Sequence, residues 1–380
     1  MANYKIILCL LYITALGFGQ SLSPNTTGSF IYTPNTPLQN KLVEVFYHIP
    51  NGDITTMPIV MSFHGAGRNA NDYRDYWIDM ANNNGFMVFA PEFSETYFPT
   101  GDNYQLATIF DDGDNPSLAT FNNQNEWTIS IIDPLFEHIK TTVSGNQETY
   151  NAWGHSGGAQ FLHRFVTYLP DSKLDIAICS NAGWYTVPEN SVSFPYGILN
   201  GELPNASLLS AFTKKLIVHL GLNDTDTNSA GLRHNTTVDN QQGTNRLARG
   251  RYYFNTAQTT SQNMLASFNW EKHEVLGVGH DAQAMANNAL QFVLTSSLSN
   301  SKHALLKSLD INPNPTTGKI AFNNSYLKLK QATLFNSLGL VVATYSTTDY
   351  KYRQEIDISS LPSGLYFLQL DTKIVKILKK

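Results

Sequence analysis

The sequence predicts an α/β protein with a doubly wound, mostly parallel sheet, followed by a small all-β sandwich domain. Three features support this prediction. Short apolar runs alternate with helix-like segments from about residue 42 to residue 298. Several of these runs are almost wholly apolar, which is typical of strands covered on both faces. After about residue 309 the pattern changes to short alternating strands separated by turn residues.

The α/β part contains strand-like and helix-like segments in alternation. The expected strands are residues 42–49, 58–63, 86–90, 149–153, 174–180, 215–220 and 274–278. The expected helices are residues 71–84, 126–143, 159–169, 258–268 and 282–298. Pro134 falls inside the second helix, where it marks either the true first turn or a kink. The alternation indicates right-handed crossovers between parallel strands.

Two long segments, residues 94–125 and 183–212, interrupt this alternation. Long loops between sheet elements are often functional. The first segment contains the acidic cluster Asp111-Asp112-Gly113-Asp114, whose closely spaced carboxylates suit Ca²⁺. The spacing of a known calcium loop is missing, so we favour a solvated turn and expect no metal site, with calcium as the alternative.

The C-terminal part begins after a change in composition. Serine-rich residues around 296–302 indicate a linker, which we place at residues 299–308. The strand-like segments that follow are residues 332–335, 341–345, 354–358 and 365–370. Together with the turn residues at 312–318, they predict a small β-sandwich over residues 309–380.

The N-terminus has the layout of a secretory signal peptide. Lys5 precedes an apolar stretch over residues 6–18, which ends in small residues before Gln20. We therefore expect a signal peptide at residues 1–19 and a first folded domain at residues 20–298. The apolar stretch is too short for a comfortable membrane span, and no other stretch reaches ~18 apolar residues.

Cysteine content fits export without disulfides. Cleavage of the expected signal peptide removes Cys9 and leaves Cys179 as the single cysteine, so no intrachain disulfide is possible. Cys179 lies in an apolar run, where we expect a buried structural thiol.

Charge is distributed unevenly along the chain, whose net charge is −5. Residues 20–308 carry 15 Lys and Arg against 25 Asp and Glu. Residues 309–380 carry 9 Lys and Arg against 5 Asp and Glu. The acidic first part argues against nucleic acid as a partner.

Residues Gly154-His155-Ser156-Gly157-Gly158 fit the motif G-x-S-x-G between a strand-like and a helix-like segment. A serine on such a tight turn exposes its hydroxyl, and only glycine-sized neighbours leave room for the turn. The helix N-terminus behind it offers unpaired N–H groups to a developing oxyanion. The motif predicts Ser156 as a catalytic nucleophile.

A serine nucleophile needs a base, and the base needs an orienting acid. Asp224 directly follows the apolar run at 216–220, and His280 follows the last expected strand. Both lie at the carboxyl ends of strands, where a doubly wound sheet presents its chemistry. We predict His280 as the base and Asp224 as the acid, with Asp226 as the alternative acid.

The turn Ser62-Phe63-His64-Gly65-Ala66-Gly67-Arg68 ends an early expected strand. We predict that the N–H groups of Gly157 and Ala66 form an oxyanion hole, with Gly67 as the second choice after Ala66. Trp184 and Tyr185 follow the strand after the motif. They either line a substrate cleft or belong to the core.

With these residues in place, residues 40–298 resemble the α/β-hydrolase superfamily, and more closely secreted esterases of the polyhydroxybutyrate-depolymerase and feruloyl-esterase type. The segments Gln242-Gly243-Thr244-Asn245-Arg246-Leu247-Ala248-Arg249-Gly250 and Gly277-Val278-Gly279-His280 look like a subgroup of these proteins. The resemblance implies Ser156 as nucleophile, Asp224 as acid and His280 as base, with no cofactor. The lack of a disulfide and the short His-Gly-Ala-Gly turn depart from several relatives.

Residues 309–380 resemble the C-terminal sorting domain of the Bacteroidetes type IX secretion system. The likeness rests on Asn312-Pro313-Asn314-Pro315-Thr316-Thr317-Gly318, Leu334-Phe335-Asn336-Ser337-Leu338-Gly339, Leu361-Pro362-Ser363-Gly364-Leu365-Tyr366 and the lysine-rich end. It implies that the type IX machinery is a partner and that the protein is secreted or at the cell surface. The alternative is a carbohydrate-binding or adhesive β-sandwich.

The sequence therefore predicts an exported serine hydrolase that acts on extracellular esters through an acyl-enzyme. A serine peptidase of the same fold is one alternative, because the same triad serves amides. A catalytically inactive surface binding protein is the other. Substrate identity, oligomeric state and anchoring after export are not encoded in any motif of the chain.

Overall fold

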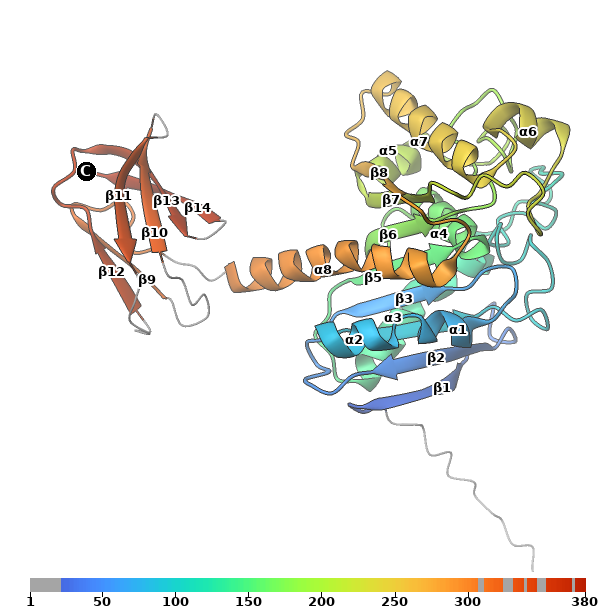
Figure 1. Cartoon of the computed structure of the whole chain (residues 1–380), viewed down its shortest axis with the longest axis horizontal. Coiled ribbons are helices and arrows are strands. Elements are labelled where there is room, and N and C mark those ends of the chain that lie inside the picture. The colour runs from blue at the N-terminus through green and yellow to red at the C-terminus, as the bar shows by residue number, and fades with distance from the viewer. Residues whose placement is uncertain (1–21, 307–310, 324–330, 338–339, 347–352, 371–372) are drawn as a thin grey trace, which may run out of the picture. The chain divides into compact units, whose positions relative to one another are not determined.

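The computed structural model describes residues 22–306, 311–323, 331–337, 340–346, 353–370 and 373–380. The expected signal peptide at residues 1–19 lies outside the described residues. The chain divides into two compact units, Met1–Ser296 and Ser297–Lys380 (Figure 1).

Within the described residues, the larger unit contains one eight-stranded sheet in the order β1-β2-β4-β3-β5-β6-β7-β8. The pairs β1–β2 and β2–β4 are antiparallel, and the other neighbours are parallel. The strands are β1 (Thr26–Tyr32), β2 (Val43–Ile49), β3 (Ile59–Phe63), β4 (Met87–Glu92), β5 (Tyr150–His155), β6 (Leu174–Ser180), β7 (Lys215–Gly221) and β8 (Trp270–Val275). This arrangement confirms the predicted mostly parallel sheet.

Helices cover both faces of this sheet. The helices are α1 (Ala70–Asp75), α2 (Ile78–Asn84), α3 (Ile132–Thr142), α4 (Gly157–Tyr168), α5 (Asn205–Thr213), α6 (Thr236–Gln242), α7 (Arg246–Asn263) and α8 (Ala282–Leu306), with short 3₁₀ turns at Gln124–Glu126 and Thr128–Ile131. Figure 1 shows α1, α2 and α8 in front of the sheet and α3 and α4 behind it.

Strand β3 is apolar at every position except Ser62, whose hydroxyl donates to the Tyr73 carbonyl oxygen at 2.9 Å. Ile59, Met61 and Phe63 are buried in the core cluster that contains α3 and α4 residues. Val60 is buried in the opposite cluster, with residues of α1, α2 and α8. Successive side chains of a strand point to opposite faces, so a strand covered on both faces is apolar at nearly every position.

Several element boundaries differ from the sequence prediction. The helix expected at 71–84 is two short helices, α1 and α2, with Trp77 buried between them. Pro134 lies in the first turn of α3, where its missing N–H leaves no helical hydrogen bond unmade. Helix α8 continues to Leu306 through residues expected to be a linker.

Helix α7 begins at Arg246, 12 residues before the expected start at residue 258, and it includes Gly250. This glycine is required by packing rather than by a turn. A Cβ on Gly250 would lie 2.2 Å from a methyl carbon of Leu220 on β7. Glycine here allows the helix to lie close against the sheet.

The described part of the smaller unit that follows α8 is all β, as predicted. Its described strands form a sheet in the order β11-β10-β13-β14 and a two-stranded sheet of β12 and β9. The strands are β9 (Lys319–Asn323), β10 (Gln331–Asn336), β11 (Val341–Ser346), β12 (Arg353–Asp357), β13 (Gly364–Leu370) and β14 (Lys373–Lys379). A separate apolar cluster, which includes Ile320, Leu334 and Leu368, fills its interior. Among the helices described, none is long and apolar enough to cross a bilayer.

Candidate active site

Ser156 lies on the turn between β5 and α4, in a strained backbone conformation with φ 55° and ψ −115°. Its N–H donates to the Ser180 carbonyl oxygen at 2.9 Å. A Cβ on Gly154 would lie 2.5 Å from the Gly158 carbonyl oxygen, and one on Gly158 would lie 2.1 Å from the Phe63 carbonyl oxygen. The two glycines of the motif are therefore sterically required, and they allow the turn to hold Ser156 in this conformation.

His280 contacts both the serine and an acid. Its Nε2 lies 3.1 Å from the Ser156 hydroxyl oxygen, and its Nδ1 lies 2.8 Å from Oδ2 of Asp224. Asp224 follows β7 and is 3% exposed, whereas the His280 side chain is 27% exposed. The three side chains come from the carboxyl ends of three parallel strands. This chain of contacts is the geometry in which an imidazole takes a proton from a hydroxyl while a carboxylate stabilises the imidazolium.

The two aspartates considered for the acid have different surroundings. Asp224 faces His280, while Asp226 is exposed and its Oδ1 accepts a hydrogen bond from the Asn228 N–H at 2.8 Å. Of the two, Asp224 is the one in contact with the imidazole.

The histidines near Ser156 other than His280 are buried and serve as packing and hydrogen-bond groups. Burial lowers the pKa of His64 to about 3, and His64 Nε2 accepts a hydrogen bond from the Phe93 N–H at 3.0 Å. Burial, together with the neighbouring His280, lowers the pKa of His155 well below its usual value. The His155 ring lies 4.5 Å from the His280 ring, centroid to centroid, and its Nδ1 lies 3.3 Å from the Tyr73 hydroxyl.

Two backbone N–H groups lie beside Ser156. A Cβ on Gly157 would lie 3.1 Å from the Ala66 nitrogen, which places the turn after β3 against the first residue of α4. Among the described residues, neither the Gly157 N–H nor the Ala66 N–H has a hydrogen-bond acceptor. Two unpaired backbone donors close to an exposed serine hydroxyl are the kind of groups that can bind an oxyanion. A Gly157 Cβ would also lie 3.2 Å from Nε2 of Gln105, which the sequence had not singled out.

Trp184 and Tyr185 are buried in the main core, with exposed fractions of 4% and 0%. The Tyr185 ring stacks on Tyr253 with 4.4 Å between centroids. The Trp184 ring lies between two guanidinium groups, with Arg164 at 4.4 Å and Arg233 at 5.0 Å. In this structure both aromatics are core residues rather than an open cleft wall.

The acidic cluster at residues 111–114 is satisfied by its own surroundings. Asp112 accepts hydrogen bonds from the Asp114 and Asn115 N–H groups, and Asp114 pairs with Arg233 at 2.6 Å. No group of three or more His, Cys, Asp or Glu in the described part of the chain is arranged to hold a metal ion. The carboxylates of this turn are therefore paired with backbone N–H groups and with the Arg233 guanidinium.

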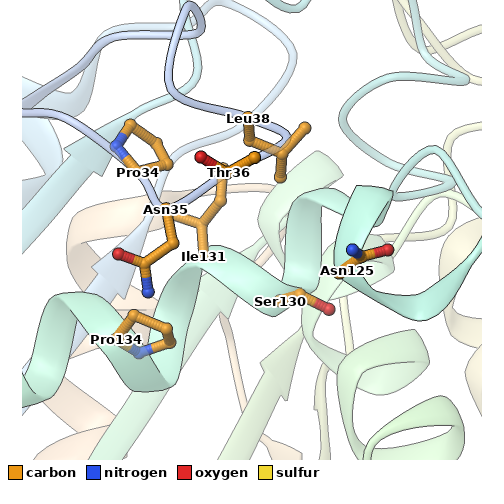
Figure 2. A pocket seen from close by; sticks show the side chains of 8 residues that line it. All are labelled: Pro34, Asn35, Thr36, Leu38, Asn125, Ser130, Ile131 and Pro134. Carbon is orange, nitrogen blue, oxygen red and sulfur yellow. The ribbon is translucent and has the colours of Figure 1, made fainter.

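A surface pocket lies apart from Ser156. Figure 2 shows side chains from the segment between β1 and β2 facing side chains from the two 3₁₀ turns and the first turn of α3. They line a space of about 220 Å³. The lining residues are Pro34, Asn35, Thr36, Leu38, Asn125, Ser130, Ile131 and Pro134. None of these residues belongs to the contact series of Ser156, His280 and Asp224. We therefore do not place the candidate active site in this pocket.

A buried arginine next to Asp224 was missed as a candidate site residue. Arg246 opens α7, and its Nη1 lies 3.6 Å from Oδ1 of Asp224, with both side chains at most 3% exposed. One signal in the sequence points to it. Arginines at positions 246 and 249 occupy the first turn of a helix, where the helix dipole disfavours positive charge unless an anion is near.

Solved structures similar to this chain are hydrolases. A poly(aspartic acid) hydrolase from Sphingomonas sp. KT-1 is 33% identical, with a TM-score of 0.67, covering 72% of this chain and 100% of that protein. A poly(3-hydroxybutyrate) depolymerase from Bordetella parapertussis is 26% identical, with a TM-score of 0.66, covering 72% of this chain and 90% of that protein. No match was found among curated proteins.

Residues 310–380 match the secretion system C-terminal sorting domain. This confirms the likeness to a type IX sorting domain that the sequence indicated. Such a domain directs a protein out of the cell, so the chain is exported to the cell surface or secreted.

Proposed function

The chain belongs to the α/β-hydrolase superfamily, and on that premise we propose that it is a serine hydrolase that cleaves carboxylic esters outside the cell. The observation that carries this proposal is the contact series from Asp224 through His280 to the Ser156 hydroxyl. Superfamily members use this series for acyl transfer, and every atom it needs is present in hydrogen-bond reach.

The proposed reaction begins when Ser156 attacks the ester carbonyl carbon and His280 Nε2 accepts the hydroxyl proton. The Gly157 and Ala66 N–H groups stabilise the negative oxygen of the tetrahedral intermediate. The intermediate collapses, and the alcohol leaves with the proton from His280. Water then attacks the acyl-enzyme with His280 again as base, which releases the acid and restores Ser156.

Charge favours a neutral ester over a polyanionic substrate. Residues 20–308 carry 15 Lys and Arg against 25 Asp and Glu, so the body of the protein repels an extended anion. Among the two relatives, the depolymerase of poly(3-hydroxybutyrate) acts on an uncharged polyester, and its substrate class fits this charge better.

Amide hydrolysis is the second candidate, and one observation favours it. The relative with 33% identity is a poly(aspartic acid) hydrolase, and its polymer is an amide. A catalytically inactive binding protein is disfavoured by the complete contact series at Ser156.

The test is a comparison of p-nitrophenyl esters with peptide p-nitroanilides and oligo-aspartate on the purified protein. We expect hydrolysis of short-chain esters, and loss of that activity in Ser156→Ala. Ser117→Ala, which alters an exposed serine, is the matched control and retains activity. Hydrolysis of oligo-aspartate or anilides in preference to esters contradicts the ester assignment, and no difference between wild type and Ser156→Ala contradicts the mechanism.

A further inference from the structure

The buried Arg246 has no role in the reaction described so far, yet it is next to the acid. Its Nη1 lies 3.6 Å from Oδ1 of Asp224, the carboxylate oxygen that does not face His280. Oδ2 of the same carboxylate lies 2.8 Å from His280 Nδ1. The carboxylate is thus held from two sides, by a cation on one oxygen and by the imidazole on the other.

The placement of Arg246 is unfavourable without an anion. It is the first residue of an 18-residue helix, where the dipole opposes positive charge. It is also 2% exposed, and burial lowers the pKa of its guanidinium while Asp224 opposes that change. Its Nε is buried without a hydrogen-bond partner within the described residues. A buried charge in this position requires a counter-charge, and Asp224 is that counter-charge.

The first turn of α7 also holds the backbone of the acid loop. The Leu247 N–H donates to the Asp224 carbonyl oxygen at 3.2 Å. Arg246 donates from Nη1 to the Ser229 hydroxyl at 2.7 Å. Asn245 caps the helix by accepting from the Ala248 N–H at 2.9 Å, which fixes where the helix begins. The loop therefore has little freedom to move relative to α7.

Its neighbour Arg249 makes purely structural contacts. This guanidinium is 0% exposed and donates to the carbonyl oxygens of Gly243, Gly183 and Arg233 and to the Asp239 carboxylate. The two arginines in the first turn of α7 therefore differ in what they contact. Arg249 ties loops together, whereas Arg246 contacts the candidate catalytic acid.

We propose that Arg246 is a positioning residue that keeps the Asp224 carboxylate oriented toward His280. The proposal rests on the proposed function, because positioning matters only if the contact series works in catalysis. Removal of the guanidinium leaves the carboxylate free to rotate and removes a positive charge near the His280–Asp224 pair. A proton then binds this pair more easily, so the pair stays protonated to a higher pH.

Other charged and titratable groups also face this pair. The His155 ring of β5 lies tilted against the His280 ring, Tyr185 and Arg246 interact electrostatically with Asp224, and Asp226 interacts with Arg246. Asp281 adjoins His280 in the chain. None of these groups is altered in the variants below, so a changed titration reports on Arg246.

The experiment compares Arg246→Met and Arg246→Lys with Arg251→Met, which removes a half-buried arginine of the same helix that pairs with Glu274. The pH profile of kcat/KM for a p-nitrophenyl ester is measured for each, together with the NMR titration of the His280 ring. For Arg246→Met we expect the acid limb and the His280 titration to move up by roughly one pH unit. We also expect kcat to fall by about 10- to 10²-fold with little change in KM.

Arg246→Lys preserves the charge but not the planar fork, so its titration stays at the wild-type pH while kcat falls. Arg251→Met matches wild type in both measurements. A folded Arg246→Met with an unchanged His280 titration overturns the proposal. If that variant does not fold, Arg246→Lys decides: a shifted titration or an unchanged kcat overturns it. The NMR titration does not require turnover, so it separates failure of this proposal from failure of the proposed function.

Discussion

The nucleophile and the acid of the candidate triad are held by different physical means. Ser156 is held by steric exclusion, because a Cβ on Gly158 would lie 2.1 Å from the Phe63 carbonyl oxygen. Asp224 is held by charge and hydrogen bonds that come from the start of α7, 22 residues later in the chain. Positioning by steric exclusion requires only backbone atoms and glycines, whereas the positioning of Asp224 requires a buried ion pair.

This difference indicates which parts of a site can be recognised from the sequence alone. Positioning by steric exclusion uses glycines at a fixed short spacing, so it is visible in the sequence as a local motif. Positioning by an ion pair joins residues that are distant in the chain, and in the sequence these residues look like any other charged residue. Substitutions at Asp224 and at Gly158 test these two means of positioning separately.

Loss of the carboxylate charge has the largest expected effect on activity. We expect Asp224→Asn to lower kcat for a p-nitrophenyl ester by about 10⁴-fold, because an amide stabilises neither the imidazolium nor the required tautomer. Asp226→Asn is the matched control, since Asp226 is exposed and bonded to the Asn228 N–H, and it keeps near wild-type kcat. Equal losses in the two variants contradict the assignment of Asp224.

Addition of one methyl group tests positioning by steric exclusion. Gly158→Ala forces its Cβ into the Phe63 carbonyl, so we expect the free energy of unfolding to fall by about 3 kcal/mol or more. Gly279→Ala is the control in the same unit, because its Cβ meets nothing nearer than 3.6 Å. The measurement is urea unfolding followed by tryptophan fluorescence, and all 5 tryptophans of the chain lie in the larger unit. Wild-type stability in Gly158→Ala is evidence against the steric account.

The surroundings of Ser156 also contain a group that makes stability sensitive to acid. Burial lowers the pKa of His64 to about 3, whereas the unfolded chain has the ordinary value of about 6.5. The unfolded state therefore binds the proton first as the pH falls. The stability that neutral His64 contributes is complete above pH ~6.5 and is lost progressively toward pH ~3.

From this group alone we expect the free energy of unfolding to fall by about 2 kcal/mol between pH 7 and pH 5. The measurement is urea unfolding at both pH values for wild type and His64→Gln. The variant removes the titrating group, so its stability varies less over this interval. An identical pH dependence in the two proteins excludes His64 as a source of acid sensitivity.

Much of the fold could be predicted because its signals are local. Strands such as β6 and β3 are apolar at nearly every position, and the change of pattern after residue 309 marked the β unit. The helix expected from residue 258 begins at Arg246, and the close approach of Gly250 to Leu220 explains the glycine within it. Strand β1 was missed because it is an edge strand with mixed burial.

The candidate site divides in the same way. Ser156 and its glycines were identifiable from one short segment. Asp224 and His280 were identifiable only as residues at strand ends, and the choice against Asp226 needed the contact with His280. The nearness of Arg246 to Asp224 and of Gln105 to Gly157 follows from loop paths that no periodic pattern encodes.

The account stands on Ser156 as an activated nucleophile, and covalent labelling tests this most directly. The protein is incubated with a fluorophosphonate probe, digested and mapped by mass spectrometry. We predict one adduct on Ser156, at a rate that falls strongly in His280→Ala and Asp224→Asn and is unchanged in Asp226→Asn. Folded wild-type protein that stays unlabelled at Ser156, or labelling that does not depend on His280, contradicts the account.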